Sequence, residues 1–413
     1  MKNKVIYYYS ACVGIIVGSL KILCDPWFTD GAYYGSWYQY PKFETPIDNI
    51  PEYEYIYISH LHEDHFDSQF LKKYQKKWPN SKIIITERKF NYLAKLLKAG
   101  NFSYISANRI VKDNAIANLI PYGNDKKEEI DSVLEVISLD SNYRLLNLND
   151  VPYDIDFHKS LSQRPYKINC MLAGYSGAGP YPQTYFDTSD PVIKIKAIEK
   201  KERNLNRFLS LCEIYNAKCN IPFAGTYFLG GKLSYLNEYR GVPDPIELKK
   251  YRKDIVVPSD GGKGYVLLDN LECKIERSNE YNRDHINQYL NQYENTKYSF
   301  EKQTVENHIK EIDFPKMIDA AFLNAKRKFI KSNKISCQYE FNFGNSKHVI
   351  SIGSPDNLNF TIWQIFINEN LLYGILKGYY HWDTAEIGSH IVVRRTPDIY
   401  CRNAHKILCF MRI

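Results

Sequence analysis

The chain has 413 residues, of which 44% are hydrophobic and 24% are charged. These proportions are typical of a folded globular protein, and the length allows one large domain and a smaller one. The formal net charge of +7 is small for this length and is not gathered into a continuous basic run. The charge pattern therefore argues against nucleic-acid binding, whereas an anionic small molecule remains a suitable partner.

Nine cysteines are scattered along the chain without any Cys-x-x-Cys pair. This pattern argues against a disulfide framework and a structural zinc knuckle, and it favours a cytoplasmic protein. Lys2 and Lys4 precede an apolar stretch over residues 5–23, but glycine, serine and lysine interrupt it and no small-residue cleavage site follows. We therefore predict two strands here, Val5 to Tyr9 and Leu20 to Cys24, rather than a signal peptide or a membrane span.

Strand-like and helix-like segments alternate through the first two-thirds of the chain, which predicts an α/β fold. The expected strands cover residues 53–59, 82–86, 133–138, 143–146, 219–223 and 254–257. The expected helices cover residues 67–74, 89–99 and 193–217, the first of them capped by Asp67 or Ser68.

The end of the chain has a different pattern. Residues 271–304 are polar and rich in asparagine, as in a linker or an exposed helix. A helix is expected over residues 314–332, followed by strands over 335–343, 348–352 and 359–367. We predict a catalytic domain over residues 1–270, a linker or exposed helix over 271–304, and a smaller α+β accessory domain over 305–413.

Four candidate metal ligands follow the first of these internal strands within six residues: His60, His62, Asp64 and His65. Zinc, iron and manganese all accept imidazole and carboxylate ligands without a thiolate. A loop this short cannot wrap four side chains around one ion, so the spacing suits His60 and His62 on one metal and Asp64 and His65 on a neighbour. Two such ions can share a bridging hydroxide as a nucleophile. The alternative is a solvated polar turn.

The segment His60–His65 resembles the His-x-His-x-Asp-His signature of the metallo-β-lactamase superfamily. This resemblance implies an αββα sandwich with the metal site at one edge of two packed sheets. Asp25, in the segment Leu23–Trp27, resembles the family's early aspartate, whose carboxylate orients the metal-binding loop. Asp150 resembles the later aspartate that bridges both metals. Asp64 and Asp150 are therefore the candidate catalytic residues.

Weaker segments resemble the branch of this superfamily that contains CMP-N-acetylneuraminate hydroxylase and sugar-metabolism proteins. They are Asp25–Trp27 with Gly35–Trp37, Tyr175–Pro180 and Pro222–Gly225. The branch implies a sugar-like or nucleotide-linked substrate. Its hydroxylase carries a Rieske iron–sulfur domain, whose paired Cys and His ligands have no counterpart here. An oxygenase of this sequence would therefore need a separate electron donor.

The sequence departs from the family in its histidines. Metallo-β-lactamase proteins usually supply one more His before the bridging aspartate and another near the domain's end, yet no His occurs over residues 66–157 or 159–284. His158 is the nearby candidate ligand, although a surface or supporting position suits it equally. An iron site with open coordination positions would account for the gap, and so would a degenerate site.

Three further segments have two interpretations each. Residues 174–182 form an anion-binding nest or a plain turn. The aromatic loop over residues 27–40 covers the metal site or is simply packed. His381 to Glu386 form a second ligand cluster or, as is more common for a lone His beside Trp, a structural turn.

The sequence thus predicts a metal-dependent enzyme holding one or two Zn²⁺ or Fe²⁺ ions. The favoured hypothesis is hydrolysis of an ester, lactone or phosphodiester in a small anionic or sugar-like substrate by a metal-bound hydroxide. The second is iron-dependent hydroxylation of a sugar nucleotide. The third is a binding protein that has kept the fold and lost the chemistry. No nucleic-acid or membrane partner is expected.

Overall fold

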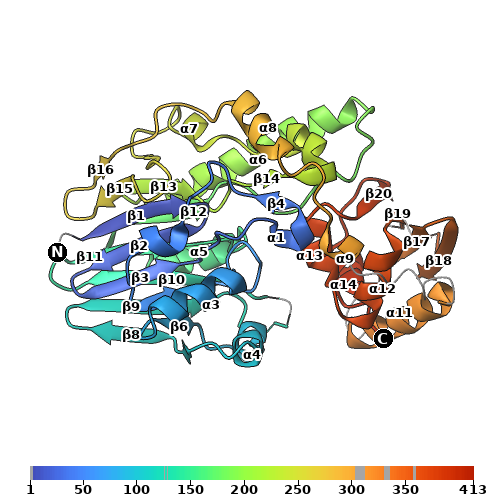
Figure 1. Cartoon of the computed structure of the whole chain (residues 1–413), viewed down its shortest axis with the longest axis horizontal. Coiled ribbons are helices and arrows are strands. Elements are labelled where there is room, and N and C mark those ends of the chain that lie inside the picture. Colours follow the sequence, from blue (N-terminus) through green and yellow to red (C-terminus); the bar gives the residue numbers. More distant parts are fainter. Residues whose placement is uncertain (1–2, 125, 128, 303–311, 330–334, 357–359) are drawn as a thin grey trace.

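The computed structural model describes residues 3–124, 126–127, 129–302, 312–329, 335–356 and 360–413. Two parts are visible in Figure 1, a larger one that contains the N-terminus and a smaller one that contains the C-terminus. None of the helices in the described part of the chain combines the length and apolarity that crossing a bilayer requires.

The larger part is built on an eight-stranded sheet whose spatial order is β16-β15-β1-β2-β3-β5-β6-β7. Its strands are β1 (Lys4–Tyr9), β2 (Cys12–Val17), β3 (Leu20–Cys24), β5 (Tyr55–Tyr57), β6 (Lys82–Ile85), β7 (Tyr104–Ser106), β15 (Tyr265–Leu267) and β16 (Glu272–Lys274). The strands from β3 to β7 run parallel to one another, and the remaining pairs are antiparallel.

A six-stranded sheet packs against the first, in the order β13-β12-β11-β10-β9-β8. Its strands are β8 (Arg109–Lys112), β9 (Ala115–Pro121), β10 (Ser132–Ser138), β11 (Tyr143–Asn147), β12 (Lys167–Gly174) and β13 (Cys219–Phe223). Strands β11, β12 and β13 are parallel, whereas β10 is antiparallel to both β11 and β9.

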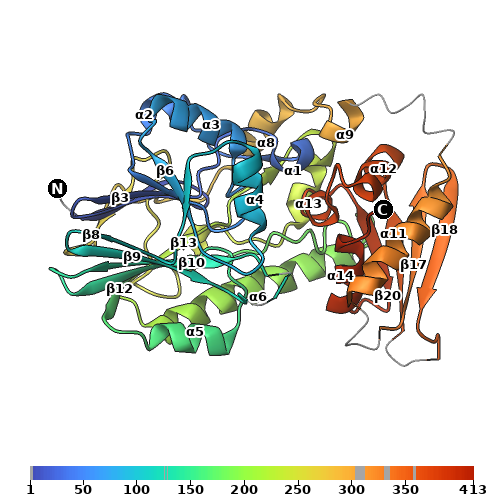
Figure 2. The ribbon, with the colours of Figure 1, turned by 90° about the horizontal axis from the view of Figure 1, so that it is seen from below.

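Helices cover both outer faces of the paired sheets (Figure 2). The first sheet carries α2 (Pro46–Asn49), α3 (Ser68–Lys77) and α4 (Tyr92–Ala99), and the second carries α5 (Ile155–Ser162), α6 (Val192–Tyr215) and α7 (Pro245–Leu248). The two faces of β3 contact different cores. Ile22 and Cys24 belong to the core between the sheets, and Leu23 belongs to the core beneath α3. Strands buried on both faces are continuously apolar for this reason.

The smaller part is a four-stranded sheet with helices packed against it, in the strand order β18-β17-β19-β20. Its strands are β17 (Cys337–Phe343), β18 (Ser346–Ile352), β19 (Thr361–Phe366) and β20 (Val392–Thr396). Its helices are α9 (Ser299–Lys302), α11 (Phe314–Phe329), α12 (Glu369–Lys377), α13 (Trp382–Ile387) and α14 (Arg402–Cys409). Trp363 and Trp382 are buried in its core. We refer to this part as the C-terminal domain.

Further short elements complete the larger part and contact the smaller one. Strands β4 (Trp37–Tyr38) and β14 (Phe228–Leu229) form a two-stranded sheet, and α8 (Arg283–Asn291) packs near the 3₁₀ helix η1 (Gly231–Tyr239). The short helix α1 (Ala32–Gly35) of the larger part contacts α13 of the C-terminal domain, and the two lie side by side in Figure 1.

The structure corrects two details of the predicted elements and shows which elements the segment predicted as a linker or exposed helix contains. Strand β2 was missed because its glycine at position 14 looked like an interruption, although every residue of Cys12–Val17 is buried. Residues 254–257 form an isolated bridge between Ile255 and Asn220 rather than a strand. The described residues of the predicted linker contain β16, α8 and α9.

Asp67 joins the start of α3 to the loop that follows β3. Its carboxylate accepts hydrogen bonds from the backbone of Phe70 at 2.9 Å, Phe28 at 2.9 Å and Thr29 at 2.7 Å, and from the Thr29 hydroxyl at 2.8 Å. We expect Asp67→Ala to lower the free energy of unfolding by about 2 kcal/mol, because it removes a helix cap and leaves further donors unpaired. Urea unfolding measures this loss.

Asn91→Ala is the matched control, because Asn91 caps α4 through the backbone of Ala94 without tying it to the loop after β3. It should cost about 1 kcal/mol. Equal losses in the two variants would contradict the linking role of Asp67.

Candidate metal centre

Strand ends of both sheets bring the candidate ligands to one edge of the sandwich. The loop His60–His65 follows β5, Asp25 ends the neighbouring parallel strand β3, and Asp150 follows β11 of the second sheet. Asp131 directly precedes β10. Because β10 is antiparallel to β11, its first residues lie at the same edge as the end of β11.

One ring nitrogen of His60 and one of His62 lie within hydrogen-bond distance of each other. Nε2 of His60 lies 2.9 Å from Nδ1 of His62. Two imidazole nitrogens that share a tetrahedral ion at about 2.05 Å lie roughly 3.3 Å apart. The observed separation is close to this value, so the pair fits a single transition-metal ion.

His65 forms the second half of the centre. Its Nε2 lies 3.4 Å from a carboxylate oxygen of Asp150 and 3.5 Å from one of Asp64. This nitrogen is buried and has no hydrogen-bond partner among the described residues. Ligand atoms of His60, His65 and Asp150 all lie within 4.8 Å of one another. A buried polar atom without a partner is costly in a native structure, and a bound cation would satisfy it.

Oxygen atoms hold the nitrogens that face away from the centre. Asp25 accepts from Nδ1 of His65 at 3.1 Å and from the backbone of Ser59 at 2.7 Å. The Ser59 hydroxyl lies 2.9 Å from Nδ1 of His60. Nε2 of His62 lies 3.0 Å from a carboxylate oxygen of Asp383, in the C-terminal domain. Metal-ligating histidines generally have such oxygen partners, because these fix the tautomer and the ring orientation.

The electrostatics of the centre favour a cation. Burial opposes the charged form of His65, yet the carboxylates of Asp64, Asp150 and Asp25 raise its pKa well above the usual value. Burial likewise opposes charge on His62, but the hydrogen bond to Asp383 and the nearby carboxylates raise its pKa to about 9. The same negative charge that stabilises an imidazolium here would attract a metal ion.

Asp131 lies beside the outward-facing nitrogen of His60, and the sequence did not reveal it. Its carboxylate oxygen lies 3.7 Å from Nδ1 of His60. Burial, together with the charge of Asp150, raises its pKa to about 7 against the effect of His62. The family usually supplies a histidine before the bridging aspartate, so a carboxylate is present in the part of the chain where no His occurs. The signal available in the sequence was an acidic residue directly before an apolar strand.

The aromatic loop after Asp25 reaches the centre as well as packing in the interior. The hydroxyl of the buried Tyr33 donates to Asp64, and the backbone of Tyr33 donates to Glu63 at 2.6 Å. The ring of Trp37 is stacked on Tyr227 with 3.5 Å between centroids. The packed interpretation of this loop is therefore confirmed, and the packed aromatic rings also place a hydroxyl against Asp64.

The structure leaves His158 outside the metal centre. This residue lies in α5, where its Nδ1 is 2.7 Å from the hydroxyl of Tyr215 and its Nε2 is 3.2 Å from the carbonyl of Pro152. Burial lowers its pKa, as expected for a neutral histidine that is satisfied by its neighbours. Both nitrogens are used, so His158 does not provide the missing ligand.

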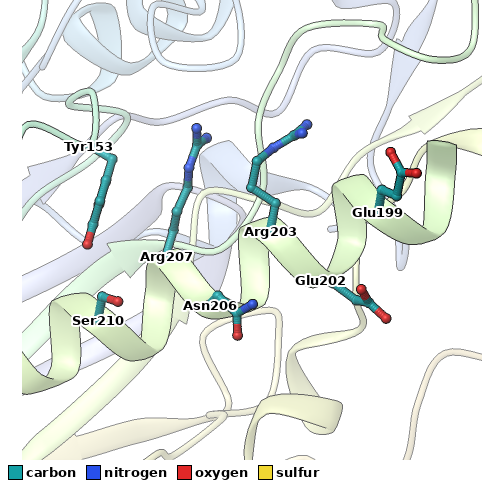
Figure 3. A pocket seen from close by; sticks show the side chains of 7 residues that line it. All are labelled: Tyr153, Glu199, Glu202, Arg203, Asn206, Arg207 and Ser210. Carbon is teal, nitrogen blue, oxygen red and sulfur yellow. The ribbon is translucent and has the colours of Figure 1, made fainter.

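Two surface pockets lie away from the candidate metal centre. One, of about 460 Å³, lies along α6 beside Tyr153, with Arg203 and Arg207 pointing to the same side of the helix (Figure 3). The other, of about 690 Å³, is lined in part by Tyr175, Arg240 and Tyr281. Neither is lined by a candidate metal ligand.

Two packed sheets between helical layers, with the His motif after a parallel strand, define the class of protein. The chain has the metallo-β-lactamase fold with a C-terminal α+β domain added. No family model matches the sequence. Similar solved structures include Igni18, a metallo hydrolase from Ignicoccus hospitalis, with 15% identity over 60% of this chain and 90% of that chain and a TM-score of 0.41. CmlA, a diiron β-hydroxylase from Streptomyces venezuelae, has 12% identity over 59% of this chain and 48% of that chain, with a TM-score of 0.36.

Curated proteins with similar sequences are of two kinds. A putative Rieske 2Fe-2S iron-sulfur protein of Mycolicibacterium smegmatis is 27% identical over 54% of this chain and 44% of its own length. The cytidine monophosphate-N-acetylneuraminic acid hydroxylase of Danio rerio is 24% identical over 59% of this chain and 42% of its own length. The chain thus spans less than half the length of these relatives.

Proposed function

We propose that this protein is a metal-dependent hydrolase that cleaves an ester, lactone or phosphodiester in a small anionic, sugar-like or nucleotide-linked substrate. The observation that carries the proposal is that ligand atoms of His60, His65 and Asp150 lie within 4.8 Å of one another, around a buried Nε2 of His65 that makes no hydrogen bond within the described part of the chain and faces the carboxylates of Asp64 and Asp150. Hydrogen bonds on the far nitrogens of these rings support it, because they turn the free nitrogens inward.

The candidate ligands form two sets, one for each of two metal ions. His60 and His62 would hold one ion, Asp64 and His65 would hold a neighbour, and Asp150 faces both halves. A bound Zn²⁺ or Fe²⁺ ion supplies Lewis acidity and lowers the pKa of a coordinated water from 15.7 to about 7. The donor set contains no thiolate, which suits either metal.

Asp150 is the carboxylate best placed to exchange a proton with an arriving substrate. Its side chain is 25% exposed, whereas that of Asp64 is 9% exposed and is held by the Tyr33 hydroxyl. A proton acceptor at the open side of the centre can deprotonate a water and later return the proton to the leaving group. Asp64 is instead held in place for ligation by its hydrogen bond from Tyr33.

A second candidate function is hydroxylation by iron and oxygen on a sugar nucleotide. The carboxylates of Asp64 and Asp150 beside His65 favour it, because imidazole and carboxylate donors suit iron. The sequence similarity to cytidine monophosphate-N-acetylneuraminic acid hydroxylases supports the same candidate. These 413 residues have no Rieske spacing of Cys and His, so electrons for such a reaction would have to come from outside them.

Metal analysis of the full chain, purified without chelator, tests both candidates. Stoichiometric zinc with turnover on a panel of esters, lactones and phosphodiesters would support the hydrolase. Iron with substrate-dependent oxygen consumption would support the hydroxylase. We expect His62→Ala to abolish both the bound metal and the turnover. Turnover retained by a metal-free His62→Ala protein would refute a metal-dependent reaction.

The third possibility, a binding protein without chemistry, predicts a different result in the same experiment. It would give less than one tightly held metal per chain and no rate above background on the panel. A wild-type protein that contains no transition metal, and gains none when zinc or iron is supplied, would overturn the whole proposal.

A further inference from the structure

The C-terminal domain reaches the metal centre through Asp383. This residue lies in α13, and its carboxylate oxygen is 3.0 Å from Nε2 of His62. Among the described residues no other acceptor contacts this nitrogen. The side chains of His62 and Asp383 are 17% and 33% exposed, so the pair is partly buried. A candidate ligand of the larger domain therefore depends on the smaller domain for its partner.

Helix α13 is held firmly within its own domain. Trp382 is buried in the C-terminal core, and its indole nitrogen donates to Glu386 at 2.8 Å. Glu386 also accepts from Nε2 of His405 at 2.7 Å and from the hydroxyl of Tyr185, a residue of the larger domain. Burial opposes charge on Glu386, but His405 lowers its pKa. These contacts fix the position of the helix that carries Asp383.

Helix α13 and its neighbours are also bonded to the aromatic loop of the larger domain. The indole nitrogen of Trp37 donates to the carbonyl of Ile387 at 3.2 Å, and Nε2 of His390 lies 2.8 Å from the carbonyl of Tyr33. The backbone nitrogen of His381 donates to the hydroxyl of Tyr34 at 2.7 Å. The contact between Asp383 and His62 thus belongs to a continuous interface between the domains.

The geometry gives Asp383 a specific effect on His62. Nδ1 of His62 faces His60 while Nε2 faces the carboxylate. A carboxylate acceptor keeps the proton on Nε2, which leaves the lone pair of Nδ1 directed at the metal and makes it more basic. Since the two ring nitrogens point in different directions, Asp383 acts through His62 rather than beside it on the same ion.

We propose that Asp383 is a positioning residue for the metal centre, through which the C-terminal domain sets the affinity of His62 for its metal ion. The inference rests on the metal site of the proposed function. It makes the C-terminal domain a part of the metal centre rather than a separate binding module. Aspartate from one domain and histidine from the other form a unit that neither domain contains alone.

A competing interpretation is that Asp383 binds a cation of its own. Ligand atoms of Asp383, His405 and Cys409 lie within 4.8 Å of one another. However, Nε2 of His405 already bonds to Glu386, and its Nδ1 lies 3.3 Å from the hydroxyl of Tyr400. Both nitrogens of this histidine are therefore used, as in a structural ion-pair network. Cys409→Ser distinguishes the two, because it removes a ligand of the second group only.

Cobalt(II) titration of the full chain in competition with a chelator tests the proposal, with the cobalt absorption spectrum as a second readout. We expect Asp383→Ala to weaken cobalt binding by about 10-fold to 100-fold, as the loss of an oxygen partner to a ligating histidine generally does. Asp383→Asn should weaken it less, because the amide oxygen still accepts from Nε2 without the charge. If Asp383→Ala does not fold, Asp383→Asn provides the comparison.

Tyr34→Phe is the matched control, because it removes a hydrogen bond between the domains without touching the histidines of the centre. Tyr34→Phe and Cys409→Ser should both leave cobalt affinity unchanged. Wild-type affinity in folded Asp383 variants would overturn the inference, and so would an equal loss in Tyr34→Phe or in Cys409→Ser. A wild-type chain that binds no cobalt would instead overturn the proposed function.

Discussion

Replacing His65 with alanine is expected to lower the affinity of the chain for zinc or cobalt by more than about 100-fold and to remove turnover with it. Loss of an oxygen partner to a ligating histidine already costs about 10-fold to 100-fold, and loss of the ligand itself costs more. His65 is central, because its Nε2 is the nitrogen that faces both Asp64 and Asp150. Chelator competition and metal analysis after dialysis measure the effect.

His65→Ala should also lower the free energy of unfolding, because it takes away the buried partner of Asp25, although Asp25 keeps its hydrogen bond from the backbone of Ser59. Circular dichroism should therefore verify that the protein used for the metal measurements is folded. His158→Gln is the matched control, because this histidine is also buried but is bonded to Tyr215 and Pro152 instead. We expect His158→Gln to change the free energy of unfolding and to leave the metal content as in wild type. Metal lost from His158→Gln and kept by His65→Ala would reverse our assignment of the ligands.

The fold and one half of the metal centre could be predicted because their signals are local. Three histidines and an aspartate within one loop, directly after an apolar strand, place four side chains together without any knowledge of the rest of the chain. The parallel pair β3 and β5 then places Asp25 beside His65, whereas Asp150 reaches the same edge from the end of β11 in the facing sheet.

Asp131 and Asp383 could not be found in this way. Asp131 reaches the centre from the start of an antiparallel strand, so its position depends on the strand order of the second sheet. Asp383 lies 321 residues after His62 in the sequence and contacts it only because the two domains pack together. A search for histidines alone also misses both, because the side chains that surround the imidazoles here are carboxylates.

The supporting position of His158, one of its two predicted interpretations, has a related cause. Distance along the chain from Asp150 made it a candidate, but residues 151–154 lead into α5, whose N-cap is Asp154. The helix turns the histidine toward Tyr215 of α6 instead of the sheet edge. Spacing in sequence is informative within a loop and loses its meaning once a helix begins.

Glu135→Ala is expected to lower the free energy of unfolding by about 3–5 kcal/mol, because it leaves a buried guanidinium without a counter-charge. Arg144 is 0% exposed and Glu135 is 1% exposed in the side chain, and the two are 3.1 Å apart. Arg144 also donates to the carbonyls of Leu161 at 3.1 Å and Ser162 at 3.0 Å, near the end of α5. Carbonyls at a helix terminus stabilise a positive charge only in part, so the carboxylate provides the main compensation.

The pH dependence of stability follows from the same ion pair. Burial alone would raise the pKa of Glu135, but hydrogen bonds from Arg164 and Asn118, together with Arg144, lower it. A carboxyl group whose folded-state pKa is depressed stabilises the protein above its unfolded pKa of about 4.3, and this contribution is lost as the pH falls through the folded-state value. We therefore expect the difference between wild type and Glu135→Ala to be full at pH 7 and to shrink at low pH.

Thermal unfolding checks the size of the effect, which corresponds to a decrease of roughly 10 °C in Tm for a domain of this size. Glu199→Ala is the matched control, because Glu199 pairs with Lys196 on the surface of α6 with side chains 50% and 31% exposed. Such a pair contributes at most about 1 kcal/mol. A double variant, Glu135→Leu with Arg144→Met, should recover much of the loss, because it removes both charges together. If Glu135→Ala lowers the free energy of unfolding no more than Glu199→Ala does, water must reach the guanidinium of Arg144. In that case α5 covers the second sheet less tightly than these contacts indicate.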